Sequence, residues 1–94
     1  MGYYFKHDYN FSYHGIQRCK ERLNLKDKTD FEVKDEVMKL IKKSTKSFET
    51  EYEIYLSAGN TDLYFVINKS SKLIITATNI SVEKQLRMIS KGNY

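Results

Sequence analysis

Residues 37–56, VMKLIKKSTKSFETEYEIYL, contain the change of pattern that decides the fold. Up to Lys43 the apolar side chains recur with the spacing of a helix. From Ser47 onward, apolar and polar side chains alternate along the chain. A period near 3.6 indicates an amphipathic helix, and a period of two indicates a half-buried strand. The stretch therefore predicts a helix, a short break at Ser44–Lys46, and then a strand.

Upstream of this stretch the sequence predicts a second helix. Ser12 is a good N-cap for a helix over about Tyr13–Leu23, and Thr29 or Asp30 caps the later helix, which runs to about Lys43. Residues 12–43 should thus form two helices. Residues 1–11 are rich in aromatic side chains and are expected to form an N-terminal arm or an edge strand.

Downstream, turn-forming residues divide the chain into short strands. Strands are expected over Ser47–Leu56, Leu63–Asn68 and Leu73–Thr78, and a short helix over residues 82–91. Short connections favour antiparallel neighbours, so residues 47–80 read as a β-meander. The predicted fold is one α+β domain over residues 1–94, with two N-terminal helices on one face of a three- to four-stranded antiparallel sheet.

Composition excludes several classes of protein. The single cysteine, Cys19, rules out an intrachain disulfide and a cysteine-based zinc site, and it is expected in the core. No apolar stretch has the length of a membrane span, so we expect a cytoplasmic protein without a membrane partner. Two histidines without a carboxylate cluster do not make a metal site, and no cofactor is expected. The net charge of +4 permits a polyanionic partner without requiring one.

The main chemical motif is HGIQRCKER, residues 14–22. His14, Arg18 and Arg22 are spaced four apart, so a helix places them in one row. This row lies away from the apolar face that includes Cys19. Histidine exchanges protons near neutral pH, and arginine stabilises charge on phosphate oxygens. These are the parts needed to cleave RNA through the ribose 2′-hydroxyl without a metal, although the same residues also suit an ordinary solvated helix face.

Other candidates lie on the strands and in the arm. Thr76 and Thr78 should share one strand face and are able to bind a phosphate oxygen, but threonine is also simply a favourable strand residue. Tyrosines on strands stack on bases or serve as packing residues. A further acid or base is available in the N-terminal arm. These candidates are Tyr52, Tyr55, Tyr64 and His7.

The motif HGIQRCKERL resembles the pattern HaxxRxxxR(I/L) of small bacterial toxin ribonucleases of the RelE-like and colicin D-like group. As architecture, the resemblance extends over about Ser12–Thr78. It implies that His14 is the acid or base and that Arg18 and Arg22 bind the phosphate or the transition state. It also implies that Thr78, or Thr76, assists. Contacts with the substrate are further expected from Lys20 and Tyr64.

The leading hypothesis is a bacterial or phage toxin-type endoribonuclease that acts on tRNA or mRNA and has a cognate antitoxin or immunity protein as its partner. The alternatives are a non-catalytic phage or mobile-element protein that inhibits a host factor, and a nucleic-acid-binding regulator.

Overall fold

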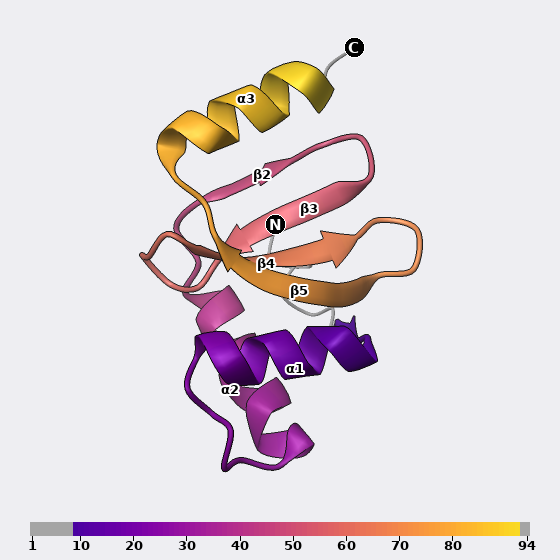
Figure 1. The fold of residues 1–94 in the computed structure, drawn as a ribbon, viewed down its shortest axis with the longest axis vertical. Helices are drawn as coiled ribbons and strands as arrows, with labels where there is room; N and C mark the ends of the chain where they lie inside the picture. Colours follow the sequence, from indigo (N-terminus) through magenta and orange to yellow (C-terminus); the bar gives the residue numbers. More distant parts are fainter. Residues whose placement is uncertain (1–8, 93–94) are drawn as a thin grey trace.

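The strands form one sheet, with α1 and α2 on one side of it and α3 on the other (Figure 1). The computed structural model describes residues 9–92, with side chains up to Met88. The elements in chain order are β1 (Asn10–Phe11), α1 (Tyr13–Arg22), α2 (Asp30–Lys42), β2 (Ser47–Glu49), β3 (Glu53–Ser57), β4 (Leu63–Asn68), β5 (Leu73–Asn79) and α3 (Val82–Gly92). The prediction of an α+β fold, with two helices ahead of the main strands and a third helix after them, is confirmed.

The sheet has five strands and is mixed, so the prediction of a three- to four-stranded antiparallel sheet is wrong in this detail. The strand order is β1-β5-β4-β3-β2. The neighbours β2 to β5 are antiparallel, but β1 pairs with β5 in parallel, with Asn10 opposite Leu73. A strand of only two residues has no alternation that a sequence pattern could reveal.

The strand predicted over Ser47–Leu56 is in fact a hairpin. β2 and β3 are joined by a turn at residues 50–52, closed by a hydrogen bond from the Thr50 amide to the Glu53 carbonyl. Phe48 and Tyr55 lie opposite each other and stack with ring centres 4.5 Å apart. They therefore share one face of the sheet, whereas a continuous strand would have placed them on opposite faces. Alternation alone does not show where a strand folds back on its neighbour.

β5 contains an irregularity that changes which side chains face the helices. Val66 pairs with Thr76, but the next residue, Ile67, pairs with Ile74, so Ile75 is an extra residue. This bulge puts Ile74 and Ala77 in the same core cluster, whereas strict alternation along a regular strand would place them on opposite faces. Thr76 and Thr78 still share a face, as predicted.

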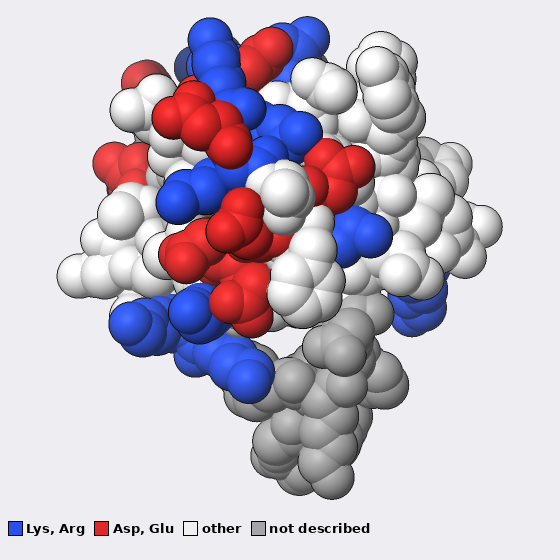
Figure 2. All heavy atoms as spheres, turned by 90° about the horizontal axis from the view of Figure 1, so that it is seen from below, with Lys and Arg blue, Asp and Glu red and all other residues white. Residues whose placement is uncertain are grey.

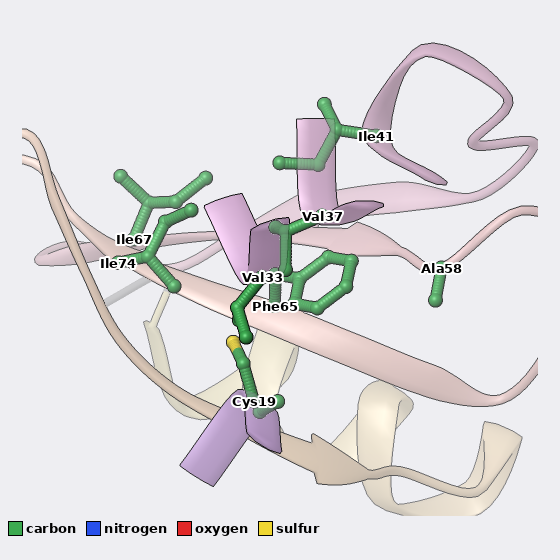
Figure 3. Close-up of a cluster of buried hydrophobic side chains, with 9 residues drawn as sticks. Cys19, Val33, Val37, Ile41, Ala58, Phe65, Ile67 and Ile74 are labelled. Carbon is green, nitrogen blue, oxygen red and sulfur yellow. The ribbon is translucent and has the colours of Figure 1, made fainter. Parts of the chain in front are cut away.

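Each face of the sheet has its own core. The core on the α1 and α2 side centres on Cys19, Val37 and Phe65, and Figure 3 shows Cys19 of α1 pointing towards Val33 and Phe65. The other core contains Tyr55, Tyr64, Val66 and Ile80, with Met88 of α3 packed against it. The two N-terminal helices thus cover one face, as predicted, and α3 covers part of the other.

Local sequence signals explain where α1 and α2 begin. The Ser12 hydroxyl accepts a hydrogen bond from the Gly15 amide at 2.9 Å, which confirms Ser12 as the N-cap of α1. Thr29 and Glu32 form a capping box at the start of α2.

Within residues 9–92, no helix combines the length and the apolar character needed to cross a bilayer.

Candidate functional site

α1 lies directly against β5, and Gly15 makes this close approach possible. The amide and the hydroxyl of Ser12 both donate to the Ile74 carbonyl, at 3.1 and 3.3 Å. A Cβ atom on Gly15 would lie 1.9 Å from the same oxygen, far inside any contact between non-bonded atoms. The Ser12 hydrogen bonds therefore anchor the N-terminal end of α1 to the start of β5, and the missing side chain of Gly15 leaves room for this contact.

Arg22 anchors the other end of α1 to β5. Its Nε donates to the Ala77 carbonyl at 3.2 Å. That carbonyl belongs to the peptide bond that joins Ala77 to Thr78, so the guanidinium lies beside the backbone of Thr78. The bond uses one of the five N–H donors of the arginine. The structure thus brings together two of the predicted site residues, Arg22 and Thr78, by way of the backbone of Thr78.

The remaining members of the row are exposed. The Arg18 Nη1 atom lies 3.1 Å from Glu21 Oε1, and both side chains are about half exposed, at 52% and 49%. An exposed pair of this kind contributes only about 0.2–1 kcal/mol and is easily exchanged for another ligand. His14 is exposed, and its ring lies edge-on to that of Tyr13, with centres 5.9 Å apart. We call His14, Arg18 and Arg22 the α1 row.

The surface around the α1 row carries both signs of charge. Figure 2 shows the end of the molecule formed by α1 and α2, where blue and red side chains are interspersed. Lys20 Nζ lies 2.8 Å from Asp30 Oδ1, and Lys39 pairs with Asp35. A phosphate would therefore be held by local contacts and not by a broad basic field.

Lys20 lies between the first two helices. Its side chain is only 20% exposed, and its ammonium group engages Asp30 in the first turn of α2. The pair links α1 to α2. The predicted contact between Lys20 and a substrate would require the ammonium to leave Asp30.

Thr76 and Thr78 point to the sheet face that α1 does not cover. They lie opposite Val66 and Tyr64, which belong to the core on the α3 side, and directly paired residues share a face. Both threonines are partly buried. The predicted residues therefore converge only in part: the α1 row flanks the edge of β5, and the threonine hydroxyls lie beyond that edge.

Tyr64 was predicted to contact the substrate, and the structure contradicts this. Its side chain has no exposed surface, and its hydroxyl accepts a hydrogen bond from Gln85 Nε2 at 2.6 Å. Tyr64 is a core residue that ties α3 to the sheet. A base cannot stack on a ring that is already covered on both sides.

The other strand tyrosines differ from one another. Tyr52 is 69% exposed in the turn between β2 and β3. Tyr55 is buried, and its hydroxyl donates to Glu53 at 2.7 Å. Burial, with the neighbouring carboxylate, raises the pKa of Tyr55, which makes proton transfer near neutral pH unfavourable. Tyr55 is therefore a packing residue.

Two further candidates concern the thiol and the N-terminal arm. Cys19 is fully buried, as predicted, and burial raises the pKa of its thiol to about 12. His7 lies outside the described residues.

Among residues 9–92 no group of three histidine, cysteine or acidic side chains is placed to hold a metal ion.

Sequence reasoning missed a pocket of about 420 Å³ on the α2 side of β2 and β3. Ile41 at the end of α2 and Leu56 on β3 contribute apolar walls, while Ser47 and Glu49 contribute polar ones. The residues that line this pocket come from separate elements that meet only in the folded chain, so no local sequence motif predicts the pocket.

Comparison of the chain with protein-family models, with curated proteins and with solved structures finds no match.

Proposed function

We propose that this protein is a metal-independent endoribonuclease of toxin type, which cleaves tRNA or mRNA by attack of a ribose 2′-hydroxyl. The observation that carries the proposal is the α1 row: an exposed imidazole and an exposed guanidinium, followed by the Arg22 guanidinium at the edge of β5, on a helix whose ends are both bonded to β5. Fixed attachment matters because catalytic groups must be held in position before the substrate arrives.

Each residue of the row has a role in this reaction. His14 exchanges a proton with one of the reacting oxygens, either with the attacking 2′-oxygen or with the departing 5′-oxygen. Solvent water takes or supplies the proton at the other oxygen. Arg18 and Arg22 stabilise the charge that develops on the phosphate. The P–O5′ bond breaks as the P–O2′ bond forms, so the products are a 2′,3′-cyclic phosphate and a 5′-hydroxyl end.

Residues next to the row have accessory roles in the proposal. The Thr78 hydroxyl assists from the sheet face that α1 does not cover, beyond the edge of β5 at which Arg22 lies, and Thr76 lies two residues before it on the same strand face. Lys20 contributes a positive charge once its bond to Asp30 is exchanged for a phosphate. Tyr64 has no part, because it is buried.

The test is cleavage of RNA in the presence of EDTA. We expect His14→Ala to lower the cleavage rate by about 10²- to 10⁴-fold, as for other acid–base groups. Arg18→Ala and Arg22→Ala should each lower it by about 10²- to 10³-fold. Arg87→Ala is the matched control, because Arg87 is an exposed arginine on α3 and its loss should leave the rate unchanged.

The chemistry supplies an independent readout. The 3′ end of the upstream product should be a cyclic phosphate, and a substrate with a single 2′-deoxyribose at the cut site should resist cleavage. A loss of less than about tenfold in His14→Ala, or equal losses in Arg87→Ala, would contradict the proposal.

The proposal includes a cognate antitoxin or immunity protein that covers the α1 row. We expect its gene to lie beside the gene of this protein, and its expression to restore growth to cells in which this protein alone is toxic. Toxicity that Arg18→Ala does not reduce would argue against a role for the row in the cell.

A non-catalytic role is the second candidate, and exposed aromatic side chains favour it. Tyr13, Phe31 and Tyr52 are 75%, 80% and 69% exposed, a pattern that suits a protein partner. A regulator that only binds nucleic acid would instead show salt-dependent binding. In both cases the cleavage assay would give no product, with wild-type protein as with His14→Ala.

A further inference from the structure

Tyr13 is an exposed aromatic residue placed directly beside the α1 row. Among the described residues five large apolar side chains are strongly exposed, and Tyr13 is the one that lies on α1. The five are Tyr13, Phe31, Tyr52, Val82 and Leu86. Tyr13 as a residue is 75% exposed, although burial of an aromatic ring is among the largest stabilising contributions in a small domain. The fold therefore makes little use of this ring.

The Tyr13 ring lies next to the His14 ring, at the N-terminal end of the α1 row. Arg18 follows His14 by one helical turn, about 6 Å of helix rise. The Tyr13 ring stands edge-on to the His14 ring, with centres 5.9 Å apart and planes at 73°. A base next to a ribose that is held at His14 would therefore lie within reach of the Tyr13 ring.

We infer that Tyr13 is the specificity-determining contact for single-stranded RNA, and that a base next to the cleaved phosphate stacks on its ring. This inference rests on the proposed function, since the phosphate and the ribose are placed by the α1 row. Stacking requires an unpaired base, because the bases of a duplex already cover one another. The substrate class is therefore an RNA loop or another unpaired segment.

The test is binding of a short single-stranded RNA with 2′-O-methyl riboses, which removes the nucleophile and prevents cleavage. Tyr13→Ala should weaken binding by about 5- to 150-fold, the range that stacking of one base provides. Tyr13→Phe keeps the ring and should bind as tightly as wild type. Tyr52→Ala, which removes a comparably exposed ring far along the chain, should have no effect.

The chain contains no tryptophan, so Tyr13→Trp introduces a unique fluorescent probe. Stacking on a base should quench its emission when RNA is added, and an RNA with an abasic site at the bound nucleotide should not quench it. Tyr52→Trp is the matched control and should remain unquenched. This readout reports contact with a base and does not depend on folding stability.

The outcomes separate this inference from the proposed function. If wild type cleaves RNA but Tyr13→Ala binds normally and the tryptophan at position 13 is not quenched, the inference is overturned and the ribonuclease proposal stands. If wild type neither binds nor cleaves RNA, both fail. Preferential binding to duplex RNA would overturn the inference alone.

Discussion

Gly15→Ala should destabilise the protein, although alanine is the better helix former. The added Cβ would lie 1.9 Å from the Ile74 carbonyl, and separating the two atoms to 3.0 Å requires a shift of about 1.1 Å. Such a shift breaks the two hydrogen bonds from Ser12 to that carbonyl, each of which contributes about 0.5–1.5 kcal/mol. Overpacking adds about 1–3 kcal/mol, and the helix propensity of alanine returns about 1 kcal/mol.

The free energy of unfolding should therefore fall by about 1–5 kcal/mol. The direction of this change, a loss and not a gain of stability, is what tests the reasoning. In a domain of this size each kcal/mol corresponds to about 4–8 °C in Tm, so thermal unfolding should show a decrease of about 4 °C or more. Gln17→Ala, an exposed position on the same helix, should change the free energy of unfolding by less than about 0.5 kcal/mol. If Gly15→Ala instead raises Tm, the close approach of α1 to β5 is refuted.

Three further predictions concern the rest of the fold. Ser57 is fully buried, and its hydroxyl accepts from the amides of Thr45 and Lys46; Ser57→Ala should cost about 1–3 kcal/mol, seen as a lower urea midpoint with an unchanged slope. The capping-box hydrogen bond to a backbone amide lowers the pKa of Glu32. Its contribution is therefore present above the ordinary carboxyl pKa and disappears as pH falls through the folded-state value. Wild type should exceed Glu32→Gln in Tm at about pH 7 and lose that advantage near pH 3, whereas a constant difference would contradict this cause. Because burial raises the pKa of Cys19, its thiol should react with a disulfide reagent at pH 8 far more slowly in the native protein than in denaturant; equal rates would show that α1 is not packed on the sheet.

The fold was predictable wherever local signals agree with the tertiary structure. Ser12 and Thr29 cap the helices because their hydroxyls satisfy amides within the next turn, which is a purely local interaction. The hairpin of β2 and β3 was not predictable from alternation, because it is defined by the pairing of the two strands, with Phe48 stacked on Tyr55 across them. The bulge at Ile75 was hidden for the same reason, since it is defined by pairing with β4.

The candidate site was predictable only along α1. Helical spacing suffices to place His14, Arg18 and Arg22 in one row, because one element carries all three. Helical spacing does not determine to which face of the sheet a residue on a strand points, or which element covers that face. Tyr64 was misassigned for this reason: its burial depends on Gln85 and on α3, which lie far along the chain.

The placement of α1 at the edge of β5 gives the ribonuclease proposal a specific geometric requirement. The α1 row lies on one side of that edge, and the hydroxyls of Thr76 and Thr78 point to the opposite sheet face. An RNA strand that contacts both the α1 row and the threonine hydroxyls must cross the edge of β5. Arg22 lies at this edge, bonded to the carbonyl of Ala77, the residue before Thr78. If the RNA crosses at this point, Thr78→Val should lower cleavage while leaving the fold intact, because valine keeps the shape of the side chain and removes only the hydroxyl. If Thr78→Val cleaves RNA at the wild-type rate, the residues of the α1 row catalyse the reaction without the Thr78 hydroxyl, and Thr76 and Thr78 have only a structural role in the sheet.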